Sequence, residues 1–326
     1  MNYDIITIGG AVEDITFYTN GGVVIDNSQD VLCQRLLAFE YGAKIRIKDA
    51  HSTFGGGAAN VSVAASRLGF KTACFCAVGD DERGKNIVEN LKKHKVDVCF
   101  VQKIKNAMSG FSFLLVGPGN EHVIFSHRAA NQELAVKSGV LKNIDSRYAY
   151  ITSLSGNWQK TARAIILQSK RFKIAWNPGA AQLEDAPRFF RKYMRYVDVI
   201  DMNEDEAAEL VASDKKIMLN HKESAKFLGN IKNLLTVIKS YGPRIVVITR
   251  GRKGADCFDG HDFYHVDIKH EIKRVDTTGV GDAFGSSFVC GLMLYNDDIK
   301  KAMDLGIRNS ASVIAKQGAQ NGLIKL

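Results

Sequence analysis

The segment Asp276-Thr277-Thr278-Gly279-Val280-Gly281-Asp282 decides how the rest of this chain of 326 residues is interpreted. Two glycines flank Val280, and the apolar run 283–295 that follows predicts a helix beginning at this turn. Such a turn directs several backbone N–H groups to one point at the positive end of a helix dipole. A carboxylate beside that point can take a proton from a hydroxyl group while the N–H groups hold developing negative charge. The segment therefore predicts phosphoryl transfer to an alcohol, with a plain glycine turn capped by Asp282 as the alternative.

The same segment resembles the second signature of the ribokinase-like (PfkB-type) carbohydrate kinase family, usually Asp-Thr-x-Gly-Ala-Gly-Asp. Only Val280 departs from that signature, in place of the usual alanine. By this resemblance Asp282 is the catalytic base, the backbone of Gly279, Val280 and Gly281 forms the anion hole, and ATP and Mg²⁺ are the cofactors. The chain has no Walker-type G-x-x-x-x-G-K-[ST] motif, which excludes the P-loop kinases.

Two stretches of the N-terminal part are candidates for binding the acceptor. Asp14 follows the strand-like segment 4–9, and a carboxylate there can accept two hydroxyl hydrogen bonds, although a turn-capping role is the alternative. The stretch Phe54-Gly55-Gly56-Gly57-Ala58-Ala59-Asn60 opens a helix that Gly69 ends, and it resembles the family's first signature, Gly-Gly-x-x-x-Asn. The resemblance therefore implies that a sugar is held by Asp14, Gly55, Gly56, Gly57 and Asn60.

One further candidate lies in the segment 127–131, which resembles the part of the family that returns from the lid to the core. Arg128 in this segment is a candidate for contact with the substrate or its new phosphate. A surface salt bridge is the alternative for this arginine.

The nucleotide is expected at three places in the C-terminal half. Thr249-Arg250-Gly251-Arg252-Lys253-Gly254 ends a predicted strand and resembles the family's Thr-x-Gly-x-x-Gly loop, which implies that Thr249, Gly251 and Gly254 bind ATP. Asn203 and Glu206 match the family's Asn-x-x-Glu motif, which is tied to phosphate and Mg²⁺. By family position, Asn309 on the predicted helix 297–316 lies near adenine.

Two metal ions follow from the same resemblance. Glu206 is expected to act on Mg²⁺ through water, because magnesium keeps much of its hydration shell. An acidic first turn of a helix, favoured by the helix dipole, is the alternative for this glutamate. Asp276, Thr278 and Gly318 resemble positions that serve a monovalent cation, which implies K⁺.

The order of predicted elements indicates the fold class. Strands at 148–153, 172–177 and 197–202 alternate with helices at 157–170 and 183–196, which predicts a parallel sheet with helices on both faces. We expect an α/β, Rossmann-like, parallel-dominated sheet with a small β-sheet lid. The large domain is predicted over 1–14, 50–97 and 128–326, and the lid over 15–49 and 98–127. Strands are expected in the lid at 22–25, 43–48, 98–102, 110–116 and 122–126, with a turn at 117–120.

Composition bounds the class of protein and its partners. The chain is 45% hydrophobic and 24% charged, as in globular proteins, and no apolar run approaches the roughly 20 residues of a membrane span. It starts with a strand-like segment rather than a signal peptide, and its six cysteines show no metal-ligand spacing, so we expect a cytoplasmic protein. The net charge of +9 is spread along the chain, so neither nucleic acid nor a membrane is expected as a partner, whereas anionic ATP suits a basic surface.

These observations predict an ATP-dependent kinase that phosphorylates a primary hydroxymethyl group. The acceptor is ribose or a similar furanose or hexose, and a ribonucleoside such as adenosine is the alternative. A phosphorylated acceptor would need cations in the lid, for which Arg46, Lys48 and Arg128 are available. A non-catalytic sugar or nucleotide sensor is an alternative from another class, although an intact Asp282 argues against it.

The lid also predicts how the protein assembles. A small sheet is marginally stable by itself and leaves edges that bind other strands. Closure on the core or the lid of a second subunit could cover it, and we expect a homodimer through the lids that buries Ile45, Ile47 and Phe113.

Overall fold

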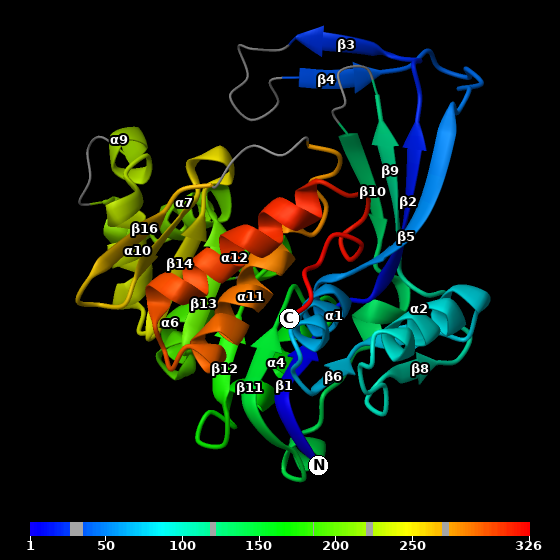
Figure 1. Ribbon diagram of the computed structural model, residues 1–326. Helices are drawn as coiled ribbons and strands as arrows, with labels where there is room; N and C mark the ends of the chain where they lie inside the picture. Colours follow the sequence, from blue (N-terminus) through cyan, green and yellow to red (C-terminus); the bar gives the residue numbers. More distant parts are fainter. Residues whose placement is uncertain (27–34, 118–121, 185, 220–223, 269–273) are drawn as a thin grey trace.

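The structure, a computed structural model, describes residues 1–26, 35–117, 122–184, 186–219, 224–268 and 274–326. Its largest feature is a sheet of eight strands in the order β16-β15-β14-β13-β12-β11-β1-β6 (Figure 1). Within this sheet β6, β1, β11, β12, β13 and β14 run parallel to one another. β15 and β16 form an antiparallel edge. The strands are β1 (Asn2–Ile8), β6 (Thr72–Phe75), β11 (Asp145–Ile151), β12 (Lys173–Trp176), β13 (Val199–Asn203), β14 (Ile245–Thr249), β15 (Ala255–Phe258) and β16 (Phe263–Val266).

Helices cover both faces of this sheet because neighbouring residues of each buried strand point to opposite sides. Ile6 packs in the apolar cluster of one face, whereas Ile5 packs in the cluster of the other. The first face carries α4 (Trp158–Ile166), α6 (Ala186–Tyr193), α7 (Glu204–Ala212) and α10 (Ile231–Ser240). The second face carries α1 (Gly57–Arg67), α11 (Val280–Leu294) and α12 (Ile299–Ile314). The predicted α/β class with a mainly parallel sheet is therefore confirmed.

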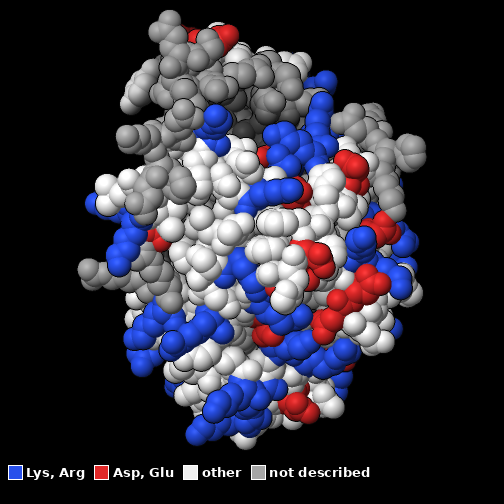
Figure 2. Space-filling view, turned by 90° about the vertical axis from the view of Figure 1, so that its left-hand side faces the viewer, with Lys and Arg blue, Asp and Glu red and all other residues white. Residues whose placement is uncertain are grey.

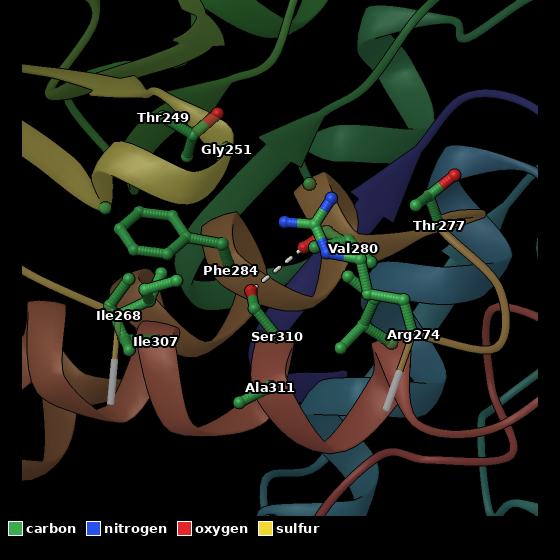
Figure 3. Close-up of a pocket in the computed structure, with 13 residues that line it drawn as sticks. Thr249, Gly251, Ile268, Arg274, Thr277, Val280, Phe284, Ile307, Ser310 and Ala311 are labelled. Carbon is green, nitrogen blue, oxygen red and sulfur yellow. Dashed lines mark hydrogen bonds between the residues drawn. The ribbon is translucent and has the colours of Figure 1, made fainter. Parts of the chain in front are cut away.

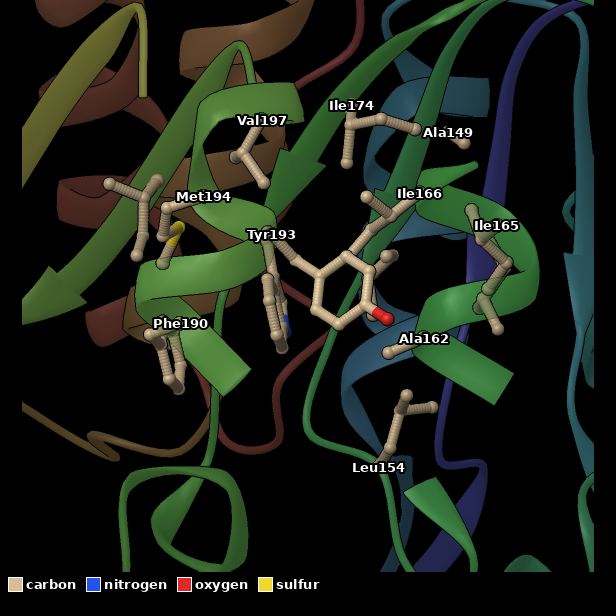
Figure 4. Close-up of a cluster of buried hydrophobic side chains, with 14 of the residues drawn as sticks. Ala149, Leu154, Ala162, Ile165, Ile166, Ile174, Phe190, Tyr193, Met194 and Val197 are labelled. Carbon is tan, nitrogen blue, oxygen red and sulfur yellow. The ribbon is translucent and has the colours of Figure 1, made fainter. Parts of the chain in front are cut away.

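The core of the first face is built largely from aromatic and branched side chains. In Figure 4, Tyr193 of α6 and Ile166 of α4 lie near Ile174 of β12, and Phe190 of α6 belongs to the same buried cluster. The indole of Trp176 stacks on Phe190 with ring centroids 4.9 Å apart and planes at 8°. This continuous packing makes the sheet a rigid support for residues at the ends of its strands.

A second sheet of four strands, in the order β10-β9-β2-β5, forms the lid (Figure 1). It consists of β2 (Val12–Tyr18), β5 (Asp49–Gly55), β9 (Phe111–Val116) and β10 (His122–His127). A separate antiparallel pair, β3 (Val23–Asp26) and β4 (Arg35–Ala38), lies beyond it. The strands predicted at 22–25, 110–116 and 122–126 are thus confirmed. Most of the turn predicted at 117–120 lies outside the described residues.

Two predicted lid strands are wrong. Residues 43–48 form no strand, because the segment makes separate bonds rather than a ladder: Thr19 Oγ1 donates to the carbonyl of Arg46 at 3.0 Å, and Lys48 N donates to that of Tyr18 at 2.7 Å. The segment 98–102 mostly forms a turn closed by Val101 N and the carbonyl of Val98 at 3.0 Å. The strand there is β8 (Gln102–Ile104), which pairs with β7 (Ala77–Gly79) instead of the lid.

The remaining elements connect these layers. They are α2 (Glu82–Lys93), the 3₁₀ helix η2 (Ala129–Glu133), α3 (Ser138–Leu141), α5 (Ala180–Glu184), η3 (Met194–Tyr196), α8 (Lys215–Met218), α9 (Ser224–Leu228) and η4 (Gly251–Lys253). None of the described helices is both long and apolar enough to cross a membrane. On the face seen in Figure 2, lysines and arginines lie in several groups with acidic residues between them. The residue ranges expected for the two domains stay a prediction.

Candidate active site

The glycine turn of residues 279–281 lies at the N-terminus of α11 and borders a cavity. Gly279 caps the helix with φ of 73°, and a Cβ at this position would lie 2.3 Å from the Cβ of Ala319. Both the backbone angle and the contact therefore require glycine at 279. Gly281 is exposed, and a Cβ there would meet nothing within 4 Å. Because the first turn of a helix has no intrahelical acceptors for its N–H groups, this open side suits a bound anion.

Asp282 lies in the same first turn and is held by an amide. Nδ2 of Asn60 on α1 donates to Oδ2 of Asp282 at 2.8 Å. Burial raises the pKa of Asp282, and the hydrogen bond from Asn60 opposes that rise. A carboxylate with a raised pKa accepts a proton more readily, as a general base must. The structure therefore joins the predicted base directly to one of the predicted sugar ligands.

The second carboxylate of the site, Asp14, comes from lid strand β2 and is only 6% exposed. Burial raises its pKa to about 6; a hydrogen bond from Ser112 lowers it, and the charges of Asp276 and Asp282 raise it further. A Cβ at Gly55 would lie 1.9 Å from Oδ2 of Asp14. Gly55 is therefore needed to admit this carboxylate beside β5.

The next two glycines also make close contacts with the protein itself. Gly56 has φ of 90°, and a Cβ there would lie 2.6 Å from the carbonyl oxygen of Gly10. A Cβ at Gly57 would lie 2.7 Å from Cβ of Thr152, at the end of β11. These contacts bring the start of α1 against the loop before Asp14. Contact of the three glycines with a sugar stays a prediction.

Asp276 links the signature turn to the loop at 318. Its Oδ1 accepts a hydrogen bond from the N–H of Thr278 and its Oδ2 one from the N–H of Gly318, both at 2.8 Å. The hydroxyl oxygen of Thr278 is buried without a hydrogen-bond partner among the described residues. A carboxylate oxygen and a hydroxyl oxygen are ligands that suit a hard cation. The structure thus brings these three predicted residues together.

The cavity beside the turn has a volume of about 240 Å³ and one largely apolar wall (Figure 3). Phe284 of α11 and Ile307 of α12 contribute to that wall, and Arg274 lies at the side of Val280 and Thr277. The hydroxyl of Ser310 donates to the carbonyl of Val280 at 3.0 Å, which ties α12 to the turn. The lining residues are Thr249, Gly251, Gly254, Ile268, Arg274, Thr277, Val280, Gly281, Phe284, Ile307, Ser310, Ala311 and Ile314. An apolar slot that ends at a helix N-terminus suits a base with attached phosphates.

The predicted nucleotide loop therefore reaches this cavity through Thr249, Gly251 and Gly254. The arginine between them does not, because Arg250 Nε contacts Glu204 and its Nη1 contacts Asp256, each at 3.1 Å. These ion pairs fix the loop between α7 and β15. The structure thus assigns Arg250 to holding the loop.

Two predicted site residues do not line this cavity. Asn309 is fully buried and turned away from the cavity, because its Nδ2 donates to Oγ of Ser287 at 2.6 Å and its Oδ1 accepts from the N–H of Ile324. It joins α12 to α11 and to the C-terminal segment. Arg128 is exposed at the junction of β10 and η2, and its contact with substrate stays a prediction.

Asn203 and Glu206 form a reciprocal cap at the start of α7. Oδ1 of Asn203 accepts from the N–H of Glu206 at 2.8 Å, and Oε2 of Glu206 accepts from the N–H of Asn203 at 2.9 Å. Burial raises the pKa of Glu206, the bond from Asn203 lowers it, and the charge of Asp282 raises it. Glu206 thus caps the first turn of α7, and its contact with Mg²⁺ stays a prediction. The cap uses Oε2 of Glu206 and leaves Oε1 outside it.

A buried carboxyl that sequence reasoning missed lies behind the base. Asp201 on β13 is 3% exposed; its Oδ1 accepts from the hydroxyl of Tyr150 at 2.8 Å and its Oδ2 from Nδ2 of Asn177 at 3.2 Å. Burial raises its pKa to about 7, and the charge of Asp282 contributes to the rise. A Cβ at Gly285 of α11 would lie 2.5 Å from its Oδ2. An acid inside the otherwise apolar strand of 199–202 is the signal that could have revealed it.

A mainly parallel sheet, a β lid and a glycine turn beside a cavity define the ribokinase-like class of kinases. Residues 24–326 match the pfkB family carbohydrate kinases, and the chain belongs to this family. It is therefore a phosphotransferase that acts on an alcohol group, as the sequence predicted.

Known relatives of this chain agree with that assignment. A ribokinase of Staphylococcus aureus is 27% identical over 285 residues, which are 86% of this chain and 88% of the relative. Among solved structures, Arabidopsis thaliana ribokinase complexed with ribose and ATP has a TM-score of 0.77 at 17% identity and covers 100% of this chain and 96% of its own. A Burkholderia thailandensis nucleoside kinase in complex with inosine also has a TM-score of 0.77 at 17% identity, with 98% and 94% covered. The two structures show the shared fold.

Proposed function

We propose that this protein transfers the γ-phosphate of ATP to the primary hydroxyl of ribose or a similar sugar, with Asp282 as the general base. The observation that carries the proposal is the position of Asp282. It is half-buried in the first turn of α11, next to Gly281 of the cavity wall, and its charge raises the pKa of the lid carboxylate Asp14. A base, an anion-binding helix end and a second carboxylate for hydroxyl groups are the parts that this reaction needs.

In this proposal each site residue has a separate role in the reaction. Asp14 accepts hydrogen bonds from sugar hydroxyls and orients the acceptor, and Asp282 takes the proton of the attacking hydroxyl. The first-turn N–H groups near Gly281 face the phosphoryl group and stabilise its charge. Because little covalent chemistry falls to the protein, positioning and electrostatics supply most of the acceleration.

ATP is placed in the cavity lined by Thr249, Gly251 and Gly254, with its adenine against Phe284 and Ile307 and its phosphates toward α11. The described residues hold no group of three or more His, Cys, Asp or Glu that could bind a metal by itself. This fits Mg²⁺, which binds through water, one or two carboxylates and substrate phosphates, and Glu206 is the carboxylate we assign to it. When bound, Mg²⁺ neutralises phosphate charge.

A monovalent cation, K⁺ in our proposal, fits the loop of Asp276, Thr278 and Gly318. The buried and unpaired hydroxyl oxygen of Thr278 supports this site, since a cation would satisfy it. We expect activity to rise in potassium buffer relative to sodium buffer. Equal rates in the two buffers, measured at one ionic strength, would remove K⁺ from the proposal.

The acceptor has two candidates within the family, ribose and a ribonucleoside. Ribose is bound in one of the similar structures and inosine in another. A screen of ATP consumption over a panel of sugars and nucleosides, with Asp282→Asn as the matched control, decides between them. We expect turnover of ribose or a similar sugar by the wild type, and turnover about 10²–10⁴-fold slower by the variant. Turnover by neither would favour the sensor alternative.

The assembly and location remain parts of the proposal. The lid exposes a group of apolar side chains, which supports a homodimer through the lids. The domain ranges 1–14, 50–97 and 128–326 for the core and 15–49 and 98–127 for the lid are kept as proposed. A cytoplasmic location is supported by the described cysteines, which are free thiols as in a reducing compartment.

A further inference from the structure

Three amide side chains form an unbroken line of hydrogen bonds that ends on Asp282. Nδ2 of Asn90 on α2 donates to Oε1 of Gln320 at 2.8 Å. Nε2 of Gln320 then donates to Oδ1 of Asn60 at 2.9 Å. Nδ2 of Asn60 donates in turn to Oδ2 of Asp282 at 2.8 Å. Residues from α2, the C-terminal segment, α1 and α11 therefore share one polar chain, in which positions 60 and 320 are 260 residues apart.

The two inner amides of this line are almost completely buried. Gln320 is 5% exposed and Asn60 is 4% exposed. A buried amide without partners loses its bonds to water and destabilises the fold, so a buried amide normally has its donors and acceptors matched. Each of the two uses both its oxygen and its nitrogen within the line. The line is thus a defined arrangement, in which the orientation of one amide limits that of the next.

The direction of the line follows from the charge at its end. An ionised carboxylate only accepts hydrogen bonds, so Asn60 must present Nδ2 to Asp282. This orientation turns Oδ1 of Asn60 toward the C-terminal segment, where it needs a donor. Nε2 of Gln320 is that donor. If the amide of Asn60 rotated by half a turn, its oxygen would face the carboxylate and repel it.

The loop that carries Gln320 is itself fixed to the signature turn. The N–H of Gly318 donates to the carboxylate of Asp276. Ala319 lies so close to Gly279 that a Cβ added to Gly279 would be 2.3 Å from the Cβ of Ala319. Gln320 is therefore presented from a backbone that has little freedom to move. Groups supported in this way hold a reacting residue to within a fraction of an ångström.

We propose that Gln320 is a positioning residue for the reaction, which holds the amide of Asn60 so that it donates to Oδ2 of Asp282 and leaves Oδ1 for the acceptor hydroxyl. This inference rests on the proposed function of Asp282 as the base. In this proposal Gln320 contacts neither ATP nor the sugar. Its whole effect on the rate passes through Asn60, and the outermost residue, Asn90, fixes the orientation of Gln320 in turn.

A double-mutant cycle between Asn60 and Gln320 tests the proposal. Gln320→Met keeps the length of the side chain and removes both hydrogen bonds, and we expect kcat to fall about tenfold with the KM for ATP within about twofold. Asn60→Ala should lower kcat about 100-fold. Because Gln320 acts only through Asn60, the double variant should match Asn60→Ala alone, whereas independent roles would multiply to about 1,000-fold.

The controls separate positioning from stability. Asn321→Ala changes the neighbouring exposed side chain, whose Nδ2 donates to the carbonyl of Gln317 within the same loop, and should leave kcat unchanged. If Gln320→Met does not fold, Gln320→Glu replaces it in the cycle, because its carboxylate can accept from Asn90 but offers no donor to Asn60. Multiplying effects in the cycle, or a kcat of the Gln320 variant within twofold of wild type, would overturn the proposal. An active Asp282→Asn variant would instead overturn the proposed base.

Discussion

The main sheet buries its apolar side chains, whereas the lid region leaves several of them exposed to solvent. Strands β13 and β14 of the main sheet are buried along nearly their whole length, with helices on both faces. In the lid region, Val23, Ile124 and Phe125 remain 67%, 51% and 57% exposed. The two sheets meet at the site, because Asp282 stands on the core and Asp14 stands on lid strand β2. The proposed base is thus on a rigid support, whereas the proposed acceptor ligand is on a sheet whose apolar side chains are partly exposed.

If the two carboxylates have the roles proposed above, this difference predicts that they tolerate change differently. Asp282 is held by Asn60 and by a turn whose glycine packs on Ala319. Asp14 is enclosed by Gly55 and Ser112 within the lid. Movement of the lid would therefore change the position of Asp14 relative to Asp282 while leaving the base and its turn in place. Variants on the core side should lower kcat, and variants on the lid side should raise the KM of the acceptor.

The largest expected effect is that of Asp282→Asn on the core side. The variant is nearly isosteric and lacks the base, so we expect kcat to fall by about 10²–10⁴. Because burial raises the pKa of Asp282 in the folded state, its ionisation lowers stability as the pH rises through that pKa. The variant should therefore be at least as stable as wild type at neutral pH. Steady-state kinetics and thermal unfolding check the two statements. Activity within a few-fold of wild type would contradict the first, and a lower unfolding temperature of the variant at neutral pH would contradict the second.

The next effect separates two glycines of the same turn. Gly279→Ala forces a side chain into the Cβ of Ala319 at a φ of 73°, and we expect a loss of stability of about 2–3 kcal/mol. Gly281→Ala is the matched control, because its new Cβ meets nothing within 4 Å and the fold should be unaffected. Chemical denaturation of both variants measures the difference. Equal stability of the two would show that contact with the loop at 318–320 does not hold the turn.

The lid carboxylate should show its effect in the KM of the acceptor. Asp14→Asn weakens the acceptance of hydroxyl hydrogen bonds, and we expect that KM to rise about 10–10²-fold with the KM for ATP little changed. With a pKa of about 6, only about a tenth of the molecules carry the charged form at pH 5, so the wild-type KM should rise as the pH falls below about 6. The variant should lack this dependence. A KM that does not change between pH 5 and pH 7 in the wild type would contradict the role.

The smallest effect on stability belongs to the outer surface of the lid. Phe125→Ser should change the free energy of unfolding of the subunit by no more than about 0.5 kcal/mol, because the ring is exposed, yet it should weaken the homodimer about tenfold or more. Leu167→Ser is the matched control on the core, with 54% exposure, and should leave the dimer unchanged. Sedimentation at micromolar concentration measures both. A monomeric wild type, with lid amides no better protected from hydrogen exchange than loop amides, would leave substrate closure as the only cover for the lid.

Some parts of the site could be predicted because they follow short-range rules. The Gly-x-Gly-Asp turn, the glycines at 55–57 and the Asn-x-x-Glu motif at 203–206 are each contained within a few residues. A turn followed by an apolar helix is decided by local backbone preferences and hydrophobic periodicity. The alternation of strands and helices from 148 onward likewise implies the parallel sheet and the edge at which its ligands gather. The family and the fold class therefore followed from the sequence.

The tertiary structure alone decided which side chains meet. Asn309 and Ser310 are neighbours on α12, yet Ser310 faces the cavity and Asn309 bonds to Ser287, because packing against α11 sets how α12 is rotated. The expected strand at 43–48 failed because alternation shows only that a strand is possible, and a ladder needs a partner in register. The amide line from Asn90 to Asp282 joins residues far apart in the chain, and no spacing in the sequence records it. Local rules determined the turn that carries Asp282, and long-range packing determined which side chains hold Asp282 in position.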